Sequence, residues 1–177
     1  GIKDYICRIH RLSPTLSVGS GLCMLVFVLW QIPSCWGILN RYFVCNRRNV
    51  RGSQSLSVLL SAISHASPVH LFMNLLAYLS FGRTARRILH QWPLWPLVFG
   101  SAFSGSIMHL LFTRRSKGCM GLSGVTLAFM ALDARCFPTQ EWLVLYSVRV
   151  QARVALRAFL AWSVLGESLG GASSKIA

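Results

Sequence analysis

Acidic residues are scarce in this sequence. Its 177 residues include 4 Asp and Glu against 18 Lys and Arg, and charged residues of all kinds make up only 12%. A soluble domain usually carries about twice that share of charge. The resulting net charge of +14 can indicate nucleic-acid binding, but the sequence holds no recognised nucleic-acid module and no basic helical face. We therefore expect no nucleic-acid partner.

Paired cysteine motifs are also absent. The six cysteines form no Cys-x-x-Cys pair, and several lie in apolar runs, as is typical of buried thiols. No carboxylate or cysteine stands at ligand spacing from the neighbouring histidines His65 and His70, and zinc requires three or four ligands. The sequence therefore predicts no metal site.

Hydrophobic residues, in contrast, make up 54% of the chain. The basic residues stand in short clusters between long uncharged runs, a pattern typical of loops that flank membrane spans. Several runs approach the ~20 apolar residues that cross a bilayer as a helix. We expect an all-α, polytopic membrane helix bundle in the lipid bilayer, with a juxtamembrane segment at 1–11 and one membrane domain at 12–177. The basic residues divide almost evenly between the two sides, so they predict no orientation.

The uncharged runs define five candidate spans. Pro33 should bend or end the first, Pro68 fits the first turn of the second, and Trp92 and Trp95 are candidate interfacial anchors of the third. The fifth is weak because it contains Arg157. The predicted spans are 16–39, 69–81, a segment within 88–112, 119–133 and 154–165, with a short helix at 56–63 and loops at 41–51, 83–87, 134–151 and 166–177.

The tetrapeptide Gly121-Leu122-Ser123-Gly124 opens the fourth predicted span. Glycine and serine let membrane helices approach closely, so helix packing is one interpretation. The other is chemical, because the segment places a hydroxyl at the start of an apolar helix where water is scarce. The tetrapeptide alone leaves both open.

A second polar group stands at the start of the second span. His70 and Asn74 are four residues apart, so a helix places both on one face. They could join two helices by hydrogen bonds, or they could be two donors aimed at one point, as an oxyanion hole requires. His65 could be a third donor, a structural loop histidine or half of a metal site.

The histidine–asparagine group and the tetrapeptide together indicate a function more specifically than either does alone. His65-x4-His70-x3-Asn74 at one span and Gly121-x-Ser123-Gly124 at another resemble the rhomboid family of intramembrane serine proteases. The likeness covers about 15–177, in the order and spacing of the spans as well as the motifs. The segments Trp30–Pro33 and Arg41–Phe43 also look like the first loop of the mitochondrial branch.

This resemblance implies a six-helix core without a cofactor, of which about five helices would be present. It implies cleavage of transmembrane segments of other membrane proteins by acyl transfer through Ser123. The Ser123 backbone N–H, His70 and Asn74 would stabilise the oxyanion, with His65 as a supporting residue. Gly121 and Gly124 would let neighbouring helices press close and keep the hydroxyl accessible. A multi-pass protein of the mitochondrial inner membrane is one expectation for its location.

The general base is the largest departure from the family pattern. Rhomboids carry a histidine at the start of helix six, but none of the histidines here follows Ser123. Either Ser168-Leu169-Gly170-Gly171 aligns with the family's His-Leu-Gly-Gly and the base is replaced, or the base lies beyond Ala177. His109 in the third span is a further candidate.

Three functions remain open at this point. An active protease requires a base in the continued reading frame. A catalytically inactive rhomboid-like protein would bind membrane clients without cleaving them. A channel or transporter would require the paired motifs to be a coincidence, although polar residues inside a membrane often mark a function.

Overall fold

A computed structural model describes residues 13–89, 93–112, 118–144 and 148–169. The predicted juxtamembrane segment at 1–11, Trp92 and most of the predicted loop at 166–177 lie outside these ranges. The chain forms two compact units, residues 1–129 and 130–177, and helix α8 runs from the first into the second. Both candidate motifs lie in the first unit.

The first predicted span is bent, as Pro33 indicated. Helix α2 (Pro14–Leu29) is followed by a short 3-10 helix, η1 (Pro33–Cys35), and by α3 (Trp36–Tyr42), with a bend of 106° between α2 and the η1–α3 segment. The predicted loop at 41–51 is wrong in part, since it contains helix α4 (Arg47–Arg51). The Asn46 side chain begins α4 by accepting the N–H of Asn49 at 2.8 Å, which is the usual action of an N-cap residue.

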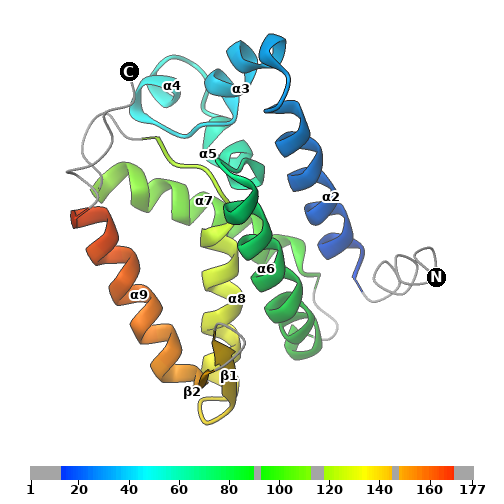
Figure 1. Ribbon diagram of the computed structural model, residues 1–177, viewed down its shortest axis with the longest axis vertical. Coiled ribbons are helices and arrows are strands. Elements are labelled where there is room, and N and C mark those ends of the chain that lie inside the picture. Colours follow the sequence, from blue (N-terminus) through cyan, green and yellow to red (C-terminus); the bar gives the residue numbers. More distant parts are fainter. Residues whose placement is uncertain (1–12, 90–92, 113–117, 145–147, 170–177) are drawn as a thin grey trace. The chain divides into compact units, whose positions relative to one another are not determined.

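The second span also follows a sharp bend. Helix α5 (Ser57–Leu60) and 3-10 helix η2 (Ser61–Ile63) match the short helix predicted at 56–63, and α6 (Pro68–Leu89) begins at the predicted proline after a 93° bend. The loop predicted at 83–87 is wrong because α6 continues through it. Its buried residues follow helical spacing and are Asn74, Tyr78, Gly82 and Ala85. The buried face of the helix therefore continues past Gly82, where the uncharged run ends. Figure 1 shows α6 beside α2, and the Tyr78 hydroxyl donates to the Thr15 carbonyl of α2 at 3.2 Å.

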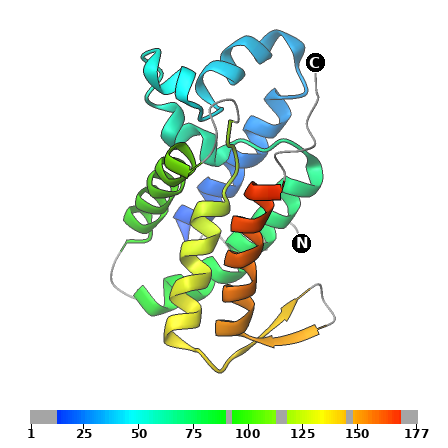
Figure 2. The same ribbon diagram turned by 90° about the vertical axis from the view of Figure 1, so that its left-hand side faces the viewer.

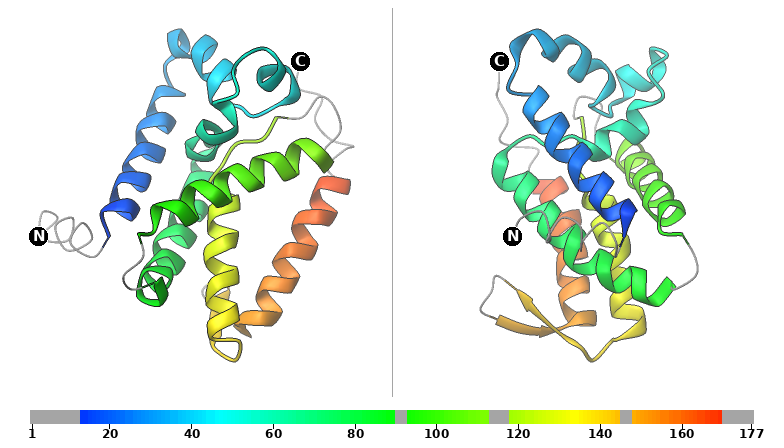
Figure 3. Two further views of the ribbon diagram at one scale, coloured as in Figure 1. Left: turned by 180° about the vertical axis from the view of Figure 1, so that it is seen from behind. Right: turned by 90° about the vertical axis from the view of Figure 1, so that its right-hand side faces the viewer.

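Helix α7 (Trp95–Phe112) and helix α8 (Ser123–Cys136) complete the predicted spans of the first unit. Figure 3 shows α7 crossing this unit with α5 and the start of α8 close to it. Among the described residues, α7 is long and apolar enough to cross a membrane by itself, and the two bent helix pairs bring the candidates to as many as three. Large apolar side chains on α7 stay exposed, including Phe99, Phe103 and Phe112. Such a surface suits lipid, as expected of a membrane helix bundle.

The second unit contains a hairpin that the sequence interpretation missed. The segment at 134–151, predicted as a loop, forms strands β1 (Glu141–Val144) and β2 (Val148–Gln151), which pair antiparallel with Trp142 opposite Val150. β-branched and aromatic residues favour this pairing. The Trp142 indole N–H donates to the buried Asp133 carboxylate at 2.7 Å. The buried carboxylate of Asp133 is therefore paired.

Helix α9 (Ala152–Leu169) follows the hairpin directly, as Figure 2 shows. It contains the weak fifth span predicted at 154–165 and extends into the predicted loop at 166–177. The Ala152 N–H donates to the Gln140 carbonyl at 2.7 Å, which anchors the start of α9 to the entry of the hairpin. Arg153 and Arg157 lie in this helix, and α9 does not join the candidate spans.

Candidate active site

Ser123 is the first residue of α8. The helix begins there because the Leu122 carbonyl accepts the N–H groups of Val125 and Thr126 at 2.9 and 3.0 Å. The N–H groups of a first helical turn have no acceptor within the helix, and the helix dipole makes this end partly positive. The Ser123 side chain is exposed, while its neighbours Leu122 and Val125 are buried. The start of α8 therefore combines an accessible hydroxyl with N–H groups suited to an anion.

The residue two positions before Ser123 has a backbone conformation that glycine favours. Gly121 has a φ of +126°, which side-chain-bearing residues rarely adopt. Its N–H donates to the Ser61 carbonyl at 2.8 Å. A Cβ at this position would lie 2.9 Å from Nε2 of His70 and 3.8 Å from Nδ2 of Asn74. The missing side chain thus lets the α8 entry lie directly against the two candidate donors.

His70 and Asn74 are positioned by the first turns of α6. The Ser67 hydroxyl accepts the His70 N–H at 3.2 Å, and the Asn74 amide donates to the His70 carbonyl at 3.0 Å. The His70 ring is half-buried and Asn74 is buried. Because one Asn74 amide hydrogen is used within the helix, the second remains for a group at the α8 entry. Both candidate donors therefore come from one helix and meet the segment that carries Ser123.

Of the three roles that its spacing left open, His65 has that of a structural loop histidine. Its ring is 1% exposed, and Nε2 accepts the backbone N–H of Leu122 at 3.4 Å. The rings of His65 and His70 meet edge to face, with 5.1 Å between centroids. An accepting Nε2 places the ring proton on Nδ1, so His65 is neutral and holds the backbone before Ser123. In the described part of the chain no cluster of His, Cys, Asp or Glu could hold a metal.

Gly124 brings α8 into backbone contact with α7. A Cβ on Gly124 would lie 3.1 Å from the Ser101 carbonyl oxygen and 3.4 Å from the Gly105 Cα. A Cβ on Gly105 would in turn lie 3.2 Å from the Gly124 Cα. Small residues permit this kind of approach between membrane helices. The packing interpretation of the tetrapeptide is therefore confirmed for Gly124, while the chemical interpretation of the exposed Ser123 stays a prediction.

Known proteins are similar to this chain in sequence. Residues 52–177 match the model of the Rhomboid domain. The chain is 31% identical over 155 residues to Rhomboid protein 1, mitochondrial, of Saccharomyces cerevisiae, an alignment that covers 84% of this chain and 44% of that protein. The chain belongs to the rhomboid family. The resemblance carried by the two motifs is thereby confirmed, and the chain spans less than half the length of this curated relative.

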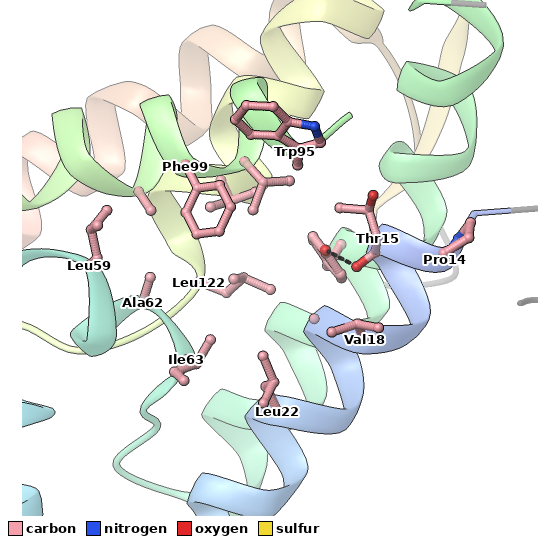
Figure 4. A pocket seen from close by; sticks show the side chains of 15 residues that line it. Pro14, Thr15, Val18, Leu22, Leu59, Ala62, Ile63, Trp95, Phe99 and Leu122 are labelled. Atoms are coloured by element: carbon pink, nitrogen blue, oxygen red, sulfur yellow. Dashed lines mark hydrogen bonds between the residues drawn. The ribbon is translucent and has the colours of Figure 1, made fainter. Parts of the chain in front are cut away.

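Leu122, within the tetrapeptide Gly121–Gly124, also lines an apolar cavity. A cavity of about 350 Å³ lies between α2, the α5–η2 segment, α6, α7 and the start of α8. Figure 4 shows Leu122 reaching toward it together with Ala62 and Ile63. Leu122 is thus directed into an apolar space while Ser123, the next residue, is exposed. Two consecutive residues at the start of α8 therefore face different surroundings, Leu122 an apolar cavity and Ser123 the exterior.

Sequence reasoning missed several groups that hold the rhomboid motif in place. The Trp30 indole donates to the Ser64 hydroxyl at 2.7 Å, and that hydroxyl lies 3.9 Å from the Met120 sulfur. Ser61 supplies the carbonyl for Gly121 and a hydroxyl 3.4 Å from that of Ser106. The serine-rich run 53–64 was the available signal, but serine spacing alone does not identify a partner.

The general base is not located in the described residues. Across 13–89, 93–112, 118–144 and 148–169 no hydrogen-bond partner of the Ser123 hydroxyl is found. His109 lies late in α7 and is half-buried, and nothing places it at Ser123. The structure thus brings the candidate donors His70 and Asn74 to the segment that carries Ser123, without a candidate base beside them in the described residues.

Proposed function

We propose that this chain carries the nucleophile and oxyanion donors of an intramembrane serine protease, which cleaves transmembrane segments of membrane proteins through Ser123. The observation that supports it most is the contact between Gly121 and His70. That contact links the Ser123 helix start to His70 and Asn74 on another helix. Family membership supplies the reaction class, since rhomboids are intramembrane serine proteases.

The mechanism follows from the groups at the α8 start. Ser123 Oγ attacks the scissile carbonyl while a base takes its proton, which gives a tetrahedral oxyanion. The Ser123 N–H, the His70 ring and the Asn74 amide then donate to this oxyanion, and a single donor of this kind contributes about 10²–10³-fold in rate. Collapse of the intermediate leaves an acyl-enzyme on Ser123, which water hydrolyses. His65 and Gly121 position the segment and do not touch the substrate.

The proton acceptor determines which of two functions applies. An active enzyme requires a base beside Ser123, and the proposal places a histidine in the reading frame beyond residue 177. The alternative is an inactive rhomboid that binds transmembrane clients. Within residues 1–177 all five histidines precede Ser123. Sequencing the transcript past codon 177 tests this requirement directly.

A fluorophosphonate probe tests the nucleophile itself. The protein from the full reading frame, purified in detergent, is treated with the probe, and the labelled peptide is identified by mass spectrometry. Ser123 should displace fluoride and carry the adduct, and Ser123→Ala should abolish labelling with unchanged thermal unfolding. Ser104→Ala is the matched control, since Ser104 is an exposed serine of α7 and its loss should change nothing.

Two outcomes would overturn the protease proposal. Labelling that persists in Ser123→Ala would place the nucleophile elsewhere. No labelling of a folded protein that still co-purifies with transmembrane peptides would establish the client-binding alternative. We also propose a mitochondrial inner membrane location, on the similarity to the yeast mitochondrial relative, and fractionation of the tagged protein tests it.

A further inference from the structure

Two cysteines far apart in the sequence face each other next to the active-site segment. Cys45 lies between α3 and α4, and Cys119 lies four residues before Ser123. They form an isolated antiparallel bridge. The Cys45 N–H donates to the Cys119 carbonyl at 3.0 Å, and the Cys119 N–H donates to the Cys45 carbonyl at 2.8 Å. Nothing in the proposed mechanism uses this pair.

The backbone at the bridge has the spacing that a disulfide needs. Residues that exchange both N–H···O bonds have Cα atoms about 5.5 Å apart, within the 4.4–6.8 Å range found for disulfides. Directly opposite residues also place their side chains on the same side. Because hydrogen-bonded pairs have the wider Cβ spacing, of about 5.5 Å, a bond would require the two Cβ atoms to approach by about 1–2 Å, which small backbone rotations must supply.

Both segments are held in this register by other contacts. A Cβ on Gly118 would lie 2.5 Å from Cγ1 of Val44, so the residue before Cys119 packs closely on the loop before α4. The Asn49 side-chain amide donates to the Val44 and Asn40 carbonyls, each at 2.8 Å. The two cysteines are therefore positioned by their surroundings and not by a chance approach of mobile loops.

The two thiols differ in the way that a stepwise oxidation requires. Cys45 is fully buried, and Cys119 is partly exposed. While both thiols are reduced, hydrogen bonds from the Cys119 thiol and the Ser106 hydroxyl lower the pKa of the Cys45 thiol, against the opposing effect of burial. In the mixed disulfide only the Ser106 hydroxyl remains to favour the Cys45 thiolate. Thiolates, not thiols, attack disulfides. Cys119 can thus meet a reagent from outside, and Cys45 can resolve the product.

We propose that Cys45 and Cys119 form a redox modification site, a dithiol that small-molecule disulfides of the glutathione class oxidise to an intramolecular disulfide. The Cys119 thiolate attacks glutathione disulfide, which forms a mixed disulfide and releases one glutathione thiolate. The Cys45 thiolate then attacks the Cys119 sulfur and releases the second. Two protein thiols lose two electrons and two protons, and one glutathione disulfide becomes two glutathione molecules. The new bond ties the entry of α8 to the loop before α4.

The experiment equilibrates the purified chain in detergent with buffers of varied glutathione to glutathione disulfide ratio. Remaining thiols are alkylated, and the peptides are identified by mass spectrometry. We expect a Cys45–Cys119 linked peptide whose share rises with the disulfide fraction. Cys35→Ser and Cys136→Ser are the controls, because these half-buried and exposed cysteines lie outside the bridge and their loss should leave the linked peptide unchanged.

A second measurement compares the unfolding temperatures of the oxidised and reduced chains. It requires no protease activity, so a negative result here can be told apart from a failure of the proposed function. The oxidised chain should unfold about 5–10 °C above the reduced chain, and Cys119→Ser should remove this difference. Accumulation of the Cys119–glutathione mixed disulfide without the linked peptide would overturn the proposal. So would a bond from Cys119 to any other cysteine, or equal unfolding temperatures for the reduced and fully cross-linked chains.

Discussion

Replacing Gly121 by alanine tests the central contact of the site. The new Cβ would lie 2.8 Å from Cε1 and 2.9 Å from Nε2 of His70, about half an ångström inside ordinary van der Waals contact. The backbone must also keep a φ of +126°, which costs a residue with a side chain about 1–3 kcal/mol. Overpacking adds a cost of about 1–3 kcal/mol. Because one local shift relieves both, we expect a total loss of about 2–4 kcal/mol in unfolding free energy.

The same shift should reduce reactivity. His70 moves away from the Ser123 helix start, and loss of one oxyanion donor costs about 10²–10³-fold in rate. The assay is the rate of fluorophosphonate labelling at Ser123 in the protein from the full reading frame, at a temperature where the variant is folded. Gly100→Ala on α7 is the matched control, since a Cβ there meets nothing within 4 Å, and it should leave both rate and stability near those of the parent. Wild-type labelling and stability in Gly121→Ala would refute the reasoning.

Three further changes have defined outcomes. Asn74→Ala should lower the labelling rate about 10²-fold with less effect on the unfolding temperature, and an unchanged rate would remove Asn74 from the donor set. His65→Ala should destabilise the chain by about 1–3 kcal/mol, because the buried Leu122 N–H loses its acceptor, and normal thermal unfolding would contradict that role. Asp133→Ala should leave the Trp142 indole N–H without its acceptor and cost about 1–3 kcal/mol. Asp133→Asn keeps an acceptor and should cost less, and equal losses for the two would argue against the hydrogen bond.

The helices of the first unit could largely be predicted from uncharged runs. Pro33 and Pro68 stand at a bend and at a helix start, because proline fixes φ and lacks an N–H. The end of α6 could not be predicted in this way. Charge marked a loop at Arg83, whereas burial of Gly82 and Ala85 extends the helix past it. Packing against a neighbouring helix keeps these residues helical although their charges favour a loop. The sequence alone does not show which helix is the neighbour.

The hairpin in the second unit shows a different limit. The sequence predicts a loop over 134–151, but in the structure Trp142, Leu143 and Val144 each have a partner across the hairpin. These partners are Val150, Arg149 and Val148 in turn. Pairing of two short segments depends on the turn between them as much as on their composition. Four-residue strands give too few alternations to show a period of two.

For the site, sequence could name the chemical groups but not the contacts between them. Spacing placed His70 and Asn74 on one helical face, and the structure has the Asn74 amide donating to the His70 carbonyl. A structural role for His65 was one of three alternatives that its spacing left open, but its partner could not be predicted, because the Leu122 N–H that it accepts lies 57 residues away. Nor could the Cys45–Cys119 bridge be foreseen from two cysteines in unrelated segments.

The close approach of Gly105 and Gly124 has an evolutionary consequence. At this crossing the two backbones are in contact, so the depth of Ser123 relative to α7 is set without help from large side chains. The exposed apolar residues of α7, such as Phe103 and Leu111, can then vary in size and number without moving the nucleophile. The exposed apolar surface is then free to adapt to bilayers of different thickness or composition while Ser123 keeps its place.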